Sequence, residues 1–328
     1  MTAPLHVIVG AGQIGPMVAA RLLARGHRVR MVRRGKFTGV PAGVETESAD
    51  VSVPGQAIAA LRGASVVYHC ANPRYHRWPQ ELAPLARGIL AGAKAAGARL
   101  VVLDNLYLYE VPAEGGISED TRGAPVSKKG VLRAAVAEAL LDAHRRGDVP
   151  VAIGRASDFI GPGAPLAASF GERFWKRLFA GKAVEVLGNP ALPHSYSYTP
   201  DVAEGLCTLG TRDEAMGRVW HLPVLPAEPT QMWLERLAAA AGVPLRQKAL
   251  GPMTLRFVGL FLPEAGEVVE MLYQFNRRFA LDDLRFRATF GAVPTPVDEV
   301  VAATVGWARS VYAPAQPAGA RLRSSAQP

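Results

Sequence analysis

The sequence is poor in cysteine and has no long apolar run, and each absence excludes a class of protein. Cys70 and Cys207 are the only cysteines in 328 residues, and neither has a CxxC motif or histidine-rich neighbours. Two such cysteines cannot build a disulfide framework or a metal site, so we expect two buried thiols and no metal. No apolar run approaches the roughly 18 residues that a membrane-spanning helix requires. We therefore expect a soluble protein without a membrane partner.

The start of the chain and its charge exclude two further classes. The first expected strand begins at Leu5, and no basic segment, apolar run or cleavage site precedes it. We therefore expect no secretory signal and a cytoplasmic location. The formal net charge is +9, but Lys and Arg are spread along the chain and accompany no nucleic-acid-binding motif. We expect no nucleic-acid partner; part of the basic surface can instead attract a phosphate-rich cofactor. A homodimer is compatible with the sequence, which does not fix the oligomeric state.

Strand and helix patterns alternate along the first half of the chain. A strand at residues 5–9, a glycine turn, an amphipathic helix at 14–25 and a strand at 28–32 form a βαβ unit. Further strands are expected near 65–70 and 99–104 and from residue 149, with helices near 82–96 and 129–146. This alternation is typical of a parallel sheet with helices on both faces. We predict an α/β fold: a doubly wound parallel (Rossmann) sheet with a smaller, mainly helical C-terminal substrate lobe.

The pattern changes after Gly161, and this change suggests a division into domains. We predict an NAD(P)-binding Rossmann domain at residues 1–165, to which residues 195–225 return. The substrate lobe is expected at 166–194 and 226–312. Residues 313–328 are rich in Ala, Pro, Ser and Arg without apolar periodicity, which is typical of a disordered tail.

The segment VIVGAGQIG contains a GxGxxG motif between the first strand and the first helix. In this context the motif indicates a dinucleotide site. Gly10 permits the tight turn, Gly12 lets the backbone approach a pyrophosphate, and Gly15 lets helix and strand pack closely. The pyrophosphate would bind N–H groups at the helix N-terminus, beside Gln13 and Ile14. The alternative is a glycine turn without a ligand.

The end of the second strand indicates which dinucleotide is bound. An NAD site usually has an Asp or Glu there to bind the adenosine ribose. This chain has Arg33 and Arg34 instead. No acid would repel a 2′-phosphate, and two guanidinium groups can bind one. We therefore predict NADP (NADPH) in preference to NAD; two exposed arginines without a ligand are the alternative.

Five segments in order make the sequence similar to a known superfamily. They are VGAGQIG, VVYHCANP, LVVLDNLYLYE, GRASDFIGPG and SYSYTPDVAEG. Together they resemble the extended and atypical branch of the short-chain dehydrogenases/reductases, which includes the NAD-dependent epimerase/dehydratase families. The resemblance spans roughly residues 5–307 and implies the predicted fold and cofactor class. It also implies that Ala71, Asn72 and Pro73 lie beside the cofactor at the end of the fourth strand.

The catalytic residues of that superfamily are replaced in this chain. The superfamily uses a Ser or Thr to polarise the substrate carbonyl, a Tyr to transfer a proton, and a Lys to hold the nicotinamide ribose. The resemblance puts Asn105, Lys129 and Arg133 at these positions. The Asn105 amide can still donate to a carbonyl oxygen, or it can only stabilise a turn. Lys129 can act as an acid only if neighbouring positive charges make it release its proton. We expect Lys129 and Arg133 to bind cofactor ribose or phosphate.

A nearby tyrosine can take over the proton transfer. Tyr107 lies two residues after Asn105, near the carboxyl end of a strand, where open α/β sheets bind ligands. Its phenol can reach a bound carbonyl, or it can form an aromatic wall. Asp158 replaces an Asn of the superfamily; we expect it near the cofactor, where it would orient a base or the nicotinamide amide, or form a salt bridge. Aromatic residues in PHSYSYTPD and MLYQFNRRF suit an apolar organic substrate, or simple packing within the lobe.

Three functions are compatible with these residues. The first is an NADPH-dependent oxidoreductase of the atypical short-chain type that reduces a carbonyl or activated double bond of a small organic substrate. The second is a nucleotide-sugar epimerase or dehydratase, which the lost Tyr and Lys disfavour because sugar oxidation depends on a phenolate base. The third is a non-catalytic NADP(H)-binding sensor or regulatory module, favoured by the three replacements and opposed by the complete substrate lobe.

Overall fold

The structure is a computed structural model of the whole chain. It describes residues 3–109, 116–164, 168–251, 253–255 and 263–313. The predicted disordered tail, apart from its first residue, lies outside the described residues. Within them, no helix is long and apolar enough to cross a membrane. The same residues contain no group of three or more His, Cys, Asp or Glu that could hold a metal ion.

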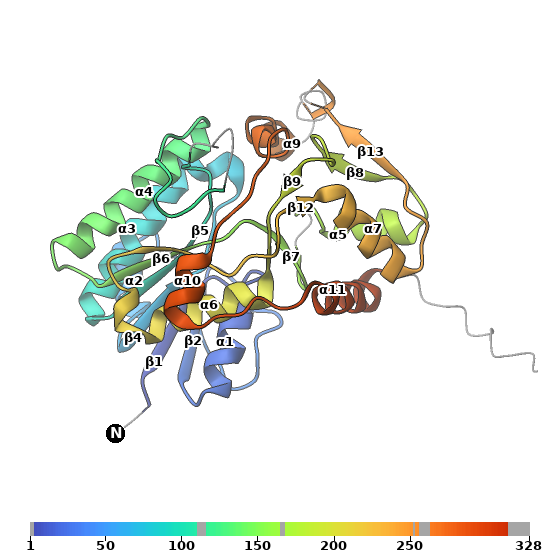
Figure 1. Cartoon of the computed structure of the whole chain (residues 1–328). Coiled ribbons are helices and arrows are strands. Elements are labelled where there is room, and N and C mark those ends of the chain that lie inside the picture. Colours follow the sequence, from blue (N-terminus) through green and yellow to red (C-terminus); the bar gives the residue numbers. More distant parts are fainter. Residues whose placement is uncertain (1–2, 110–115, 165–167, 252, 256–262, 314–328) are drawn as a thin grey trace, which may run out of the picture.

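Seven strands form one parallel sheet at the centre of the structure (Figure 1). In chain order they are β1 (Leu5–Val9), β2 (Arg28–Arg33), β3 (Glu45–Ser48), β4 (Ala64–His69), β5 (Arg99–Asp104), β6 (Val151–Arg155) and β11 (Val219–His221). Across the sheet the order is β11-β6-β5-β4-β1-β2-β3, and every neighbouring pair is parallel. The order reverses between β1 and β4, so the sheet is doubly wound, as predicted. Open α/β sheets bind ligands beyond the carboxyl ends of their strands at such a point.

Helices cover both faces of this sheet. One face carries α2 (Pro54–Ala60), α3 (Trp78–Ala96) and α4 (Lys128–Arg145); the other carries α1 (Gly15–Ala24), α6 (Thr199–Thr211) and α10 (Leu284–Phe290). Each face has its own apolar core: Ile89 and Leu140 are buried in one, and Leu22 and Phe286 in the other. The central strands β1, β4, β5 and β6 are largely apolar because both of their faces are buried.

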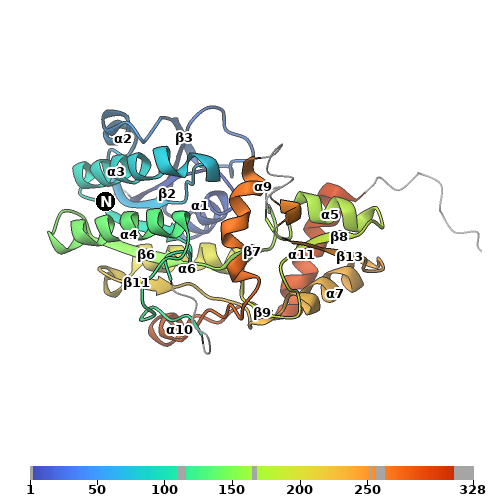
Figure 2. The same cartoon turned by 90° about the horizontal axis from the view of Figure 1, so that it is seen from above.

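A third apolar core lies outside the sheet. It is formed by α5 (Glu172–Phe179), α7 (Thr230–Ala241), α11 (Val297–Tyr312) and β8 (Val184–Leu187), and it buries Trp175 and Trp233. Strand β13 (Gln247–Leu250) pairs with β8. In Figure 2 these elements and the sheet lie on opposite sides of α9 (Pro263–Val268). The domain boundaries stay a prediction.

Short elements connect the two parts. β7 (Asp158–Ile160) pairs in parallel with β10 (Tyr196–Tyr198), and β9 (Pro193–His194) pairs antiparallel with β12 (Glu228–Pro229). Three single-turn or short 3₁₀ helices are η1 (Tyr75–Arg77), η2 (Asp213–Ala215) and η3 (Val269–Gln274), of which η3 continues directly from α9. The aromatic segments singled out in the sequence thus become β9, β10 and η3.

Candidate cofactor and substrate site

The glycine turn is packed against the end of β4. Gly10 has a φ of 110°, which favours glycine, and a Cβ there would lie 2.7 Å from the backbone nitrogen of Ala71. A Cβ on Gly15 would lie 2.0 Å from the carbonyl oxygen of Gly10. Both glycines are therefore required by close packing. Together they bring the first turn of α1 and the loop after β4 to the point where the strand order reverses.

Gly12 and Gln13 face a different environment. A Cβ on Gly12 would have no heavy atom within 4 Å, so the backbone here is open to an approaching group. The side-chain nitrogen of Gln13 donates to the carbonyl oxygen of Pro162 at 2.9 Å. Its oxygen Oε1 is buried and has no hydrogen-bond partner among the described residues. Ile14 is buried in the core below the turn, so its contribution to a ligand is limited to its backbone.

Arg133 on α4 ties this turn to the sheet. Its guanidinium donates to Oδ1 of Asn72 at 2.6 Å, lies 3.5 Å from Asp104, and stacks 4.3 Å from the ring of Trp78. Trp78 in turn donates to the carbonyl oxygen of Pro73 at 2.9 Å. The Nε group of Arg133 is buried without a partner in the described part of the chain. The loop at residues 71–73 is therefore held between the glycine turn and α4.

These residues fit a dinucleotide. Gly12 offers an open backbone for a pyrophosphate, as the motif requires. Gln13 Oε1 and Arg133 Nε are an acceptor and a donor that burial leaves unsatisfied, and unsatisfied buried groups cost free energy unless a ligand pairs with them. The ribose hydroxyls of a cofactor can supply both kinds of partner.

The two arginines after β2 differ in their surroundings. Arg34 is 63% exposed and lies within 4 Å of two carboxylates, those of Asp50 and Glu81. Arg33 donates to the carbonyl oxygen of Arg34 and lies 6.0 Å from the ring of Phe37. Arg34 thus has two carboxylates in its surroundings, whereas Arg33 contacts a backbone oxygen and an aromatic ring.

Asn105 and Tyr107 lie together at the end of β5. Oδ1 of Asn105 accepts a hydrogen bond of 3.1 Å from the Tyr107 backbone nitrogen, so the side chain does stabilise a turn. Its NH₂ group can still donate to a ligand. The Tyr107 hydroxyl forms a short hydrogen bond with the hydroxyl of Tyr75 from η1. Burial, together with Tyr75 and the charge of Asp158, raises the pKa of Tyr107 well above its ordinary value. Tyr107 is therefore a protonated phenol at neutral pH.

Lys129 is held by two carboxylates from a distant segment. Ser127 caps α4 by accepting from the Gly130 nitrogen at 3.0 Å, which places Lys129 in the first turn. The Lys129 side chain is 3% exposed, and its ammonium pairs with Glu267 of α9 and, at 2.6 Å, with Glu270 of η3. The ammonium also lies 5.4 Å from the ring of Tyr75. An ammonium has three N–H donors, and the two carboxylates occupy two of them. In this arrangement one donor of Lys129 is left for a ribose hydroxyl.

Asp158 forms a pair with a buried histidine. Its Oδ2 lies 2.7 Å from Nε2 of His194 in β9. His194 is 2% exposed and stacks on Phe275 with ring centroids 4.7 Å apart and planes at 6°. The side chain of Asp158 is 29% exposed. The carboxylate of Asp158 therefore has a side-chain partner in the protein, and this partner is His194.

A second polar network lies deeper, beneath the carboxyl ends of β5, β6 and β11. Arg155 is buried; it pairs with Asp104 at 3.2 Å and donates to the hydroxyl of Tyr109 at 2.6 Å. Tyr109 in turn lies 2.8 Å from Nε2 of His221. These contacts satisfy Arg155 within the protein, so we assign it to the support of the site.

Sequence reasoning missed Tyr75, Glu267 and Glu270. Tyr75 follows the small residues after β4, so its position next to the expected cofactor loop was a usable signal. The two glutamates stand three residues apart and share one helical face, but their partner Lys129 is more than a hundred residues away in the chain. His194 was noted only as an aromatic residue, and its pairing with Asp158 has no local signal.

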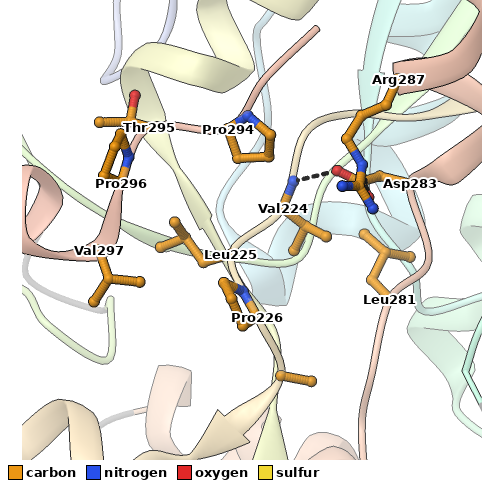
Figure 3. A pocket seen from close by; sticks show the side chains of 11 residues that line it. Val224, Leu225, Pro226, Leu281, Asp283, Arg287, Pro294, Thr295, Pro296 and Val297 are labelled. Carbon is orange, nitrogen blue, oxygen red and sulfur yellow. Dashed lines mark hydrogen bonds and ion pairs between the residues drawn. The ribbon is translucent and has the colours of Figure 1, made fainter.

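A separate cavity of about 450 Å³ is lined by none of these residues (Figure 3). Its walls come from residues 224–227 and 294–297 and are largely apolar, with three prolines. At one end Asp283 accepts from the Val224 nitrogen at 3.0 Å and pairs with Arg287 at 2.9 Å. The polar groups are thus already paired, and we assign the cavity no ligand.

Comparisons with known proteins agree with this geometry. Residues 6–222 match the model of the NAD dependent epimerase/dehydratase family. No curated protein matches the chain in sequence. The UDP-glucuronic acid 4-epimerase from Bacillus cereus in complex with NAD aligns with a TM-score of 0.75 and 16% identity, over 94% of this chain and 99% of that chain.

Two further solved structures share the fold. The UDP-glucose 4-epimerase with UDP-glucose from Thermotoga maritima has a TM-score of 0.76 and 16% identity, over 93% of this chain and 99% of that one. The dTDP-glucose 4,6-dehydratase from Bacillus anthracis in complex with NAD has a TM-score of 0.76 and 14% identity, over 94% and 97%. At such identities the neighbours establish a common fold and leave the reaction of this chain open.

These findings decide between the functional interpretations in part. The resemblance to the epimerase/dehydratase branch and the doubly wound fold are confirmed. The epimerase/dehydratase alternative is supported better than the NADPH-dependent reductase that the lost tyrosine suggested. The neighbours named here contain NAD or a nucleotide sugar. The preference for NADP and the roles of the site residues stay predictions.

Proposed function

Because this chain belongs to the NAD dependent epimerase/dehydratase family, we propose that it binds a nicotinamide dinucleotide and uses it on a small organic substrate. The substrate carbon would carry a hydroxyl or carbonyl group, as in the chemistry of epimerases and dehydratases. The cofactor would lie across the point where the strand order reverses, between β1 and β4.

One observation carries this proposal. The glycine turn, the loop at residues 71–73 and Arg133 form one continuous set of contacts, from the packing of Gly10 on Ala71 to the hydrogen bond between Asn72 and Arg133. Within it, Gly12 is open, and Gln13 Oε1 and Arg133 Nε are buried and unsatisfied among the described residues. A rigid loop that keeps an open backbone and two unpaired polar groups is suited to a ligand with phosphates and ribose hydroxyls.

The side chains around this cradle have separate proposed roles. A bound nicotinamide ring takes up or gives a hydride. Arg133 and Lys129 would hold its ribose, and Arg33 would bind a 2′-phosphate, which favours NADP. The NH₂ group of Asn105 and the hydroxyl of Tyr107 would donate hydrogen bonds to the substrate oxygen.

Nucleotide sugars are the first substrate class to test, because the structurally similar proteins include a UDP-glucuronic acid 4-epimerase and a UDP-glucose 4-epimerase. Reduction of a carbonyl by NADPH is a second candidate function. It is favoured by the phenols of Tyr75 and Tyr107: burial raises their pKa values, so neither is the phenolate base that the oxidation of a sugar hydroxyl would need.

The proposal is tested by nucleotide titration followed by turnover. The purified protein is titrated with NADH and NADPH by fluorescence and calorimetry. It is then mixed with UDP-glucose or UDP-glucuronic acid plus the oxidised cofactor, and the sugar products are separated by chromatography, because an epimerase or dehydratase returns the hydride and leaves no net change in absorbance. In parallel it is mixed with a carbonyl panel plus the reduced cofactor while nicotinamide absorbance is followed. Binding with turnover supports an enzyme. Binding without turnover of any probe favours the regulatory module, and absence of nucleotide binding contradicts the proposal.

A further inference from the structure

We propose that Asp158 is the catalytic residue that exchanges a proton with the substrate, and that His194 is a positioning residue that holds its carboxylate. This inference rests on the proposed function. It names the acid–base group that the function requires and that the replaced tyrosine no longer supplies.

The pair is built by packing that fixes the imidazole. His194 lies between two aromatic rings, with centroids 4.7 Å from Phe275 and 5.2 Å from Phe279, and its planes are tilted from theirs by 6° and 19°. Nε2 lies 2.7 Å from Oδ2 of Asp158, and Nδ1 is buried without a partner among the described residues. A carboxylate only accepts, so Nε2 carries the hydrogen of this bond. The imidazole therefore donates its Nε2 hydrogen to Oδ2 and holds that oxygen of Asp158.

Asp158 lies beside the cofactor crevice. It starts β7 directly after β6, and four residues later Pro162 accepts the hydrogen bond from Gln13 of the glycine turn. Its charge acts on four phenols, in each case as an addition to burial, and raises their pKa values; they are Tyr75 of η1, Tyr107 after β5, Tyr196 of β10 and Tyr273 of η3. Arg133 of α4 acts on Tyr75 and Tyr107 in the opposite sense. Asp158 is thus a carboxylate that interacts with phenols from four different segments of the chain.

Four other polar groups of the site are not suited to act as the base. Tyr75 and Tyr107 keep their protons because burial raises their pKa values. The ammonium of Lys129 is bound by Glu267 and Glu270, and the guanidinium of Arg133 does not release a proton in proteins. Asp158 is partly exposed, and since His194 engages Oδ2, Oδ1 is the oxygen that can face a substrate.

The proton and electron balance is that of an alcohol–carbonyl interconversion. Oδ1 of Asp158 would take the hydroxyl proton of the substrate alcohol, while an oxidised cofactor held in the crevice would accept the hydride from the same carbon, so that the carbonyl double bond forms. In the reverse direction the protonated Asp158 returns the proton to the alkoxide oxygen. His194 keeps its Nε2 hydrogen throughout, as the third group that orients a catalytic base does elsewhere.

Proton release on cofactor binding tests this assignment without a substrate. The oxidised nicotinamide ring is a cation and the reduced ring is neutral. A unit charge about 6 Å away, at an effective dielectric constant of about 20, changes the proton affinity of a group roughly 100-fold. We therefore expect binding of NADP⁺ to release on the order of 0.5 proton more per site than binding of NADPH, at the pH where this difference is largest. The 2′-phosphate is common to both, so its protons cancel.

The measurement is calorimetry in two buffers of different ionisation enthalpy, with NADP⁺ and NADPH, or with NAD⁺ and NADH if these bind more tightly. The difference should vanish in Asp158→Asn and persist in Asp201→Asn, a control that removes a half-buried carboxylate bonded to Thr295. His194→Gln should shift the pH at which the difference is largest. It also replaces Asp158→Asn as the test variant if the latter does not fold.

The outcomes separate this inference from the proposed function. Equal proton release for the two redox forms of the cofactor in the wild-type protein would overturn the assignment of Asp158. An unchanged difference in Asp158→Asn would overturn it as well. A wild-type protein that binds no nucleotide would instead contradict the proposed function itself.

Discussion

At the scale of single residues, Gly12 and Gly15 belong to one motif but meet different surroundings. A Cβ at Gly12 enters open space, whereas a Cβ at Gly15 would lie 2.0 Å from the Gly10 carbonyl oxygen. We expect Gly12→Ala to keep the thermal stability of the wild type and to weaken nucleotide binding at least tenfold. Gly15→Ala should cost about 1–3 kcal/mol of unfolding free energy, as overpacking does. Thermal unfolding and nucleotide titration of both variants check this. Full nucleotide affinity in Gly12→Ala would show that the pyrophosphate does not bind at this turn.

The arginines after β2 allow a matched test of the cofactor preference. Arg33→Ala should weaken NADPH binding roughly 10- to 150-fold and leave NADH binding unchanged, because a charge-assisted hydrogen bond to phosphate contributes about 1.5–3 kcal/mol. Arg34→Ala should have a smaller effect, because Asp50 and Glu81 lie within 4 Å of its guanidinium. Fluorescence titration of both variants with both nucleotides measures the ratio. Equal effects on NADH and NADPH would contradict a 2′-phosphate site at Arg33.

At the scale of elements, sequence patterns within a short segment predicted the helices and strands that are formed within that segment. The first βαβ unit was predicted to within about two residues, because apolar runs, Gly26 and the glycine motif lie inside one short segment. The segment formed by α9 and η3 could not be placed beside α4, since its contacts with Lys129 join residues 138 and 141 positions apart. The same applies to Asp158 and His194. The sequence thus indicated the glycine turn and its packing better than the long-range pairs of Lys129 and Asp158.

The ion pairs of Lys129 in α4 with Glu267 of α9 and Glu270 of η3 lead to a prediction about how the segment of α9 and η3 is held. Glu267→Gln with Glu270→Gln leaves the buried Lys129 ammonium without a carboxylate. The loss of unfolding free energy should be larger than the about 0–1 kcal/mol of an exposed ion pair and smaller than the about 3–5 kcal/mol of a buried one, because both glutamates are partly exposed. Adding Lys129→Met to the double variant should restore part of the stability, since the unpaired charge is removed.

Urea unfolding of the three proteins measures these losses, and amide exchange locates them. Exchange should become faster in residues 269–274 of the double variant. A triple variant less stable than the double variant would show that Lys129 is held by contacts other than these ion pairs.

At the scale of the whole molecule, three buried histidines make stability depend on pH. Burial is the main cause that lowers the pKa of His6 to about 4 and those of His69 and His221 to about 3, from 6.5. Below pH 6.5 the unfolded chain therefore binds more protons than the folded one, and stability falls as the pH falls. Each histidine contributes about 1.4 kcal/mol to the loss between pH 7.5 and 5.5. Carboxylates with lowered pKa values, such as Glu185 at about 2, act only below this range.

The expected result is a lower urea midpoint at pH 5.5 than at pH 7.5, with a loss of about 4 kcal/mol for the three histidines together. His69→Gln should remove about a third of this pH dependence, because it removes one of the three histidines that bind a proton in this pH range only when the chain is unfolded. The two slopes are compared, so a change in absolute stability caused by the substitution does not matter. A midpoint that stays constant or rises on acidification would mean that these histidines are already protonated in the folded protein, and the buried network around His221 would then have to carry a positive charge in addition to that of Arg155.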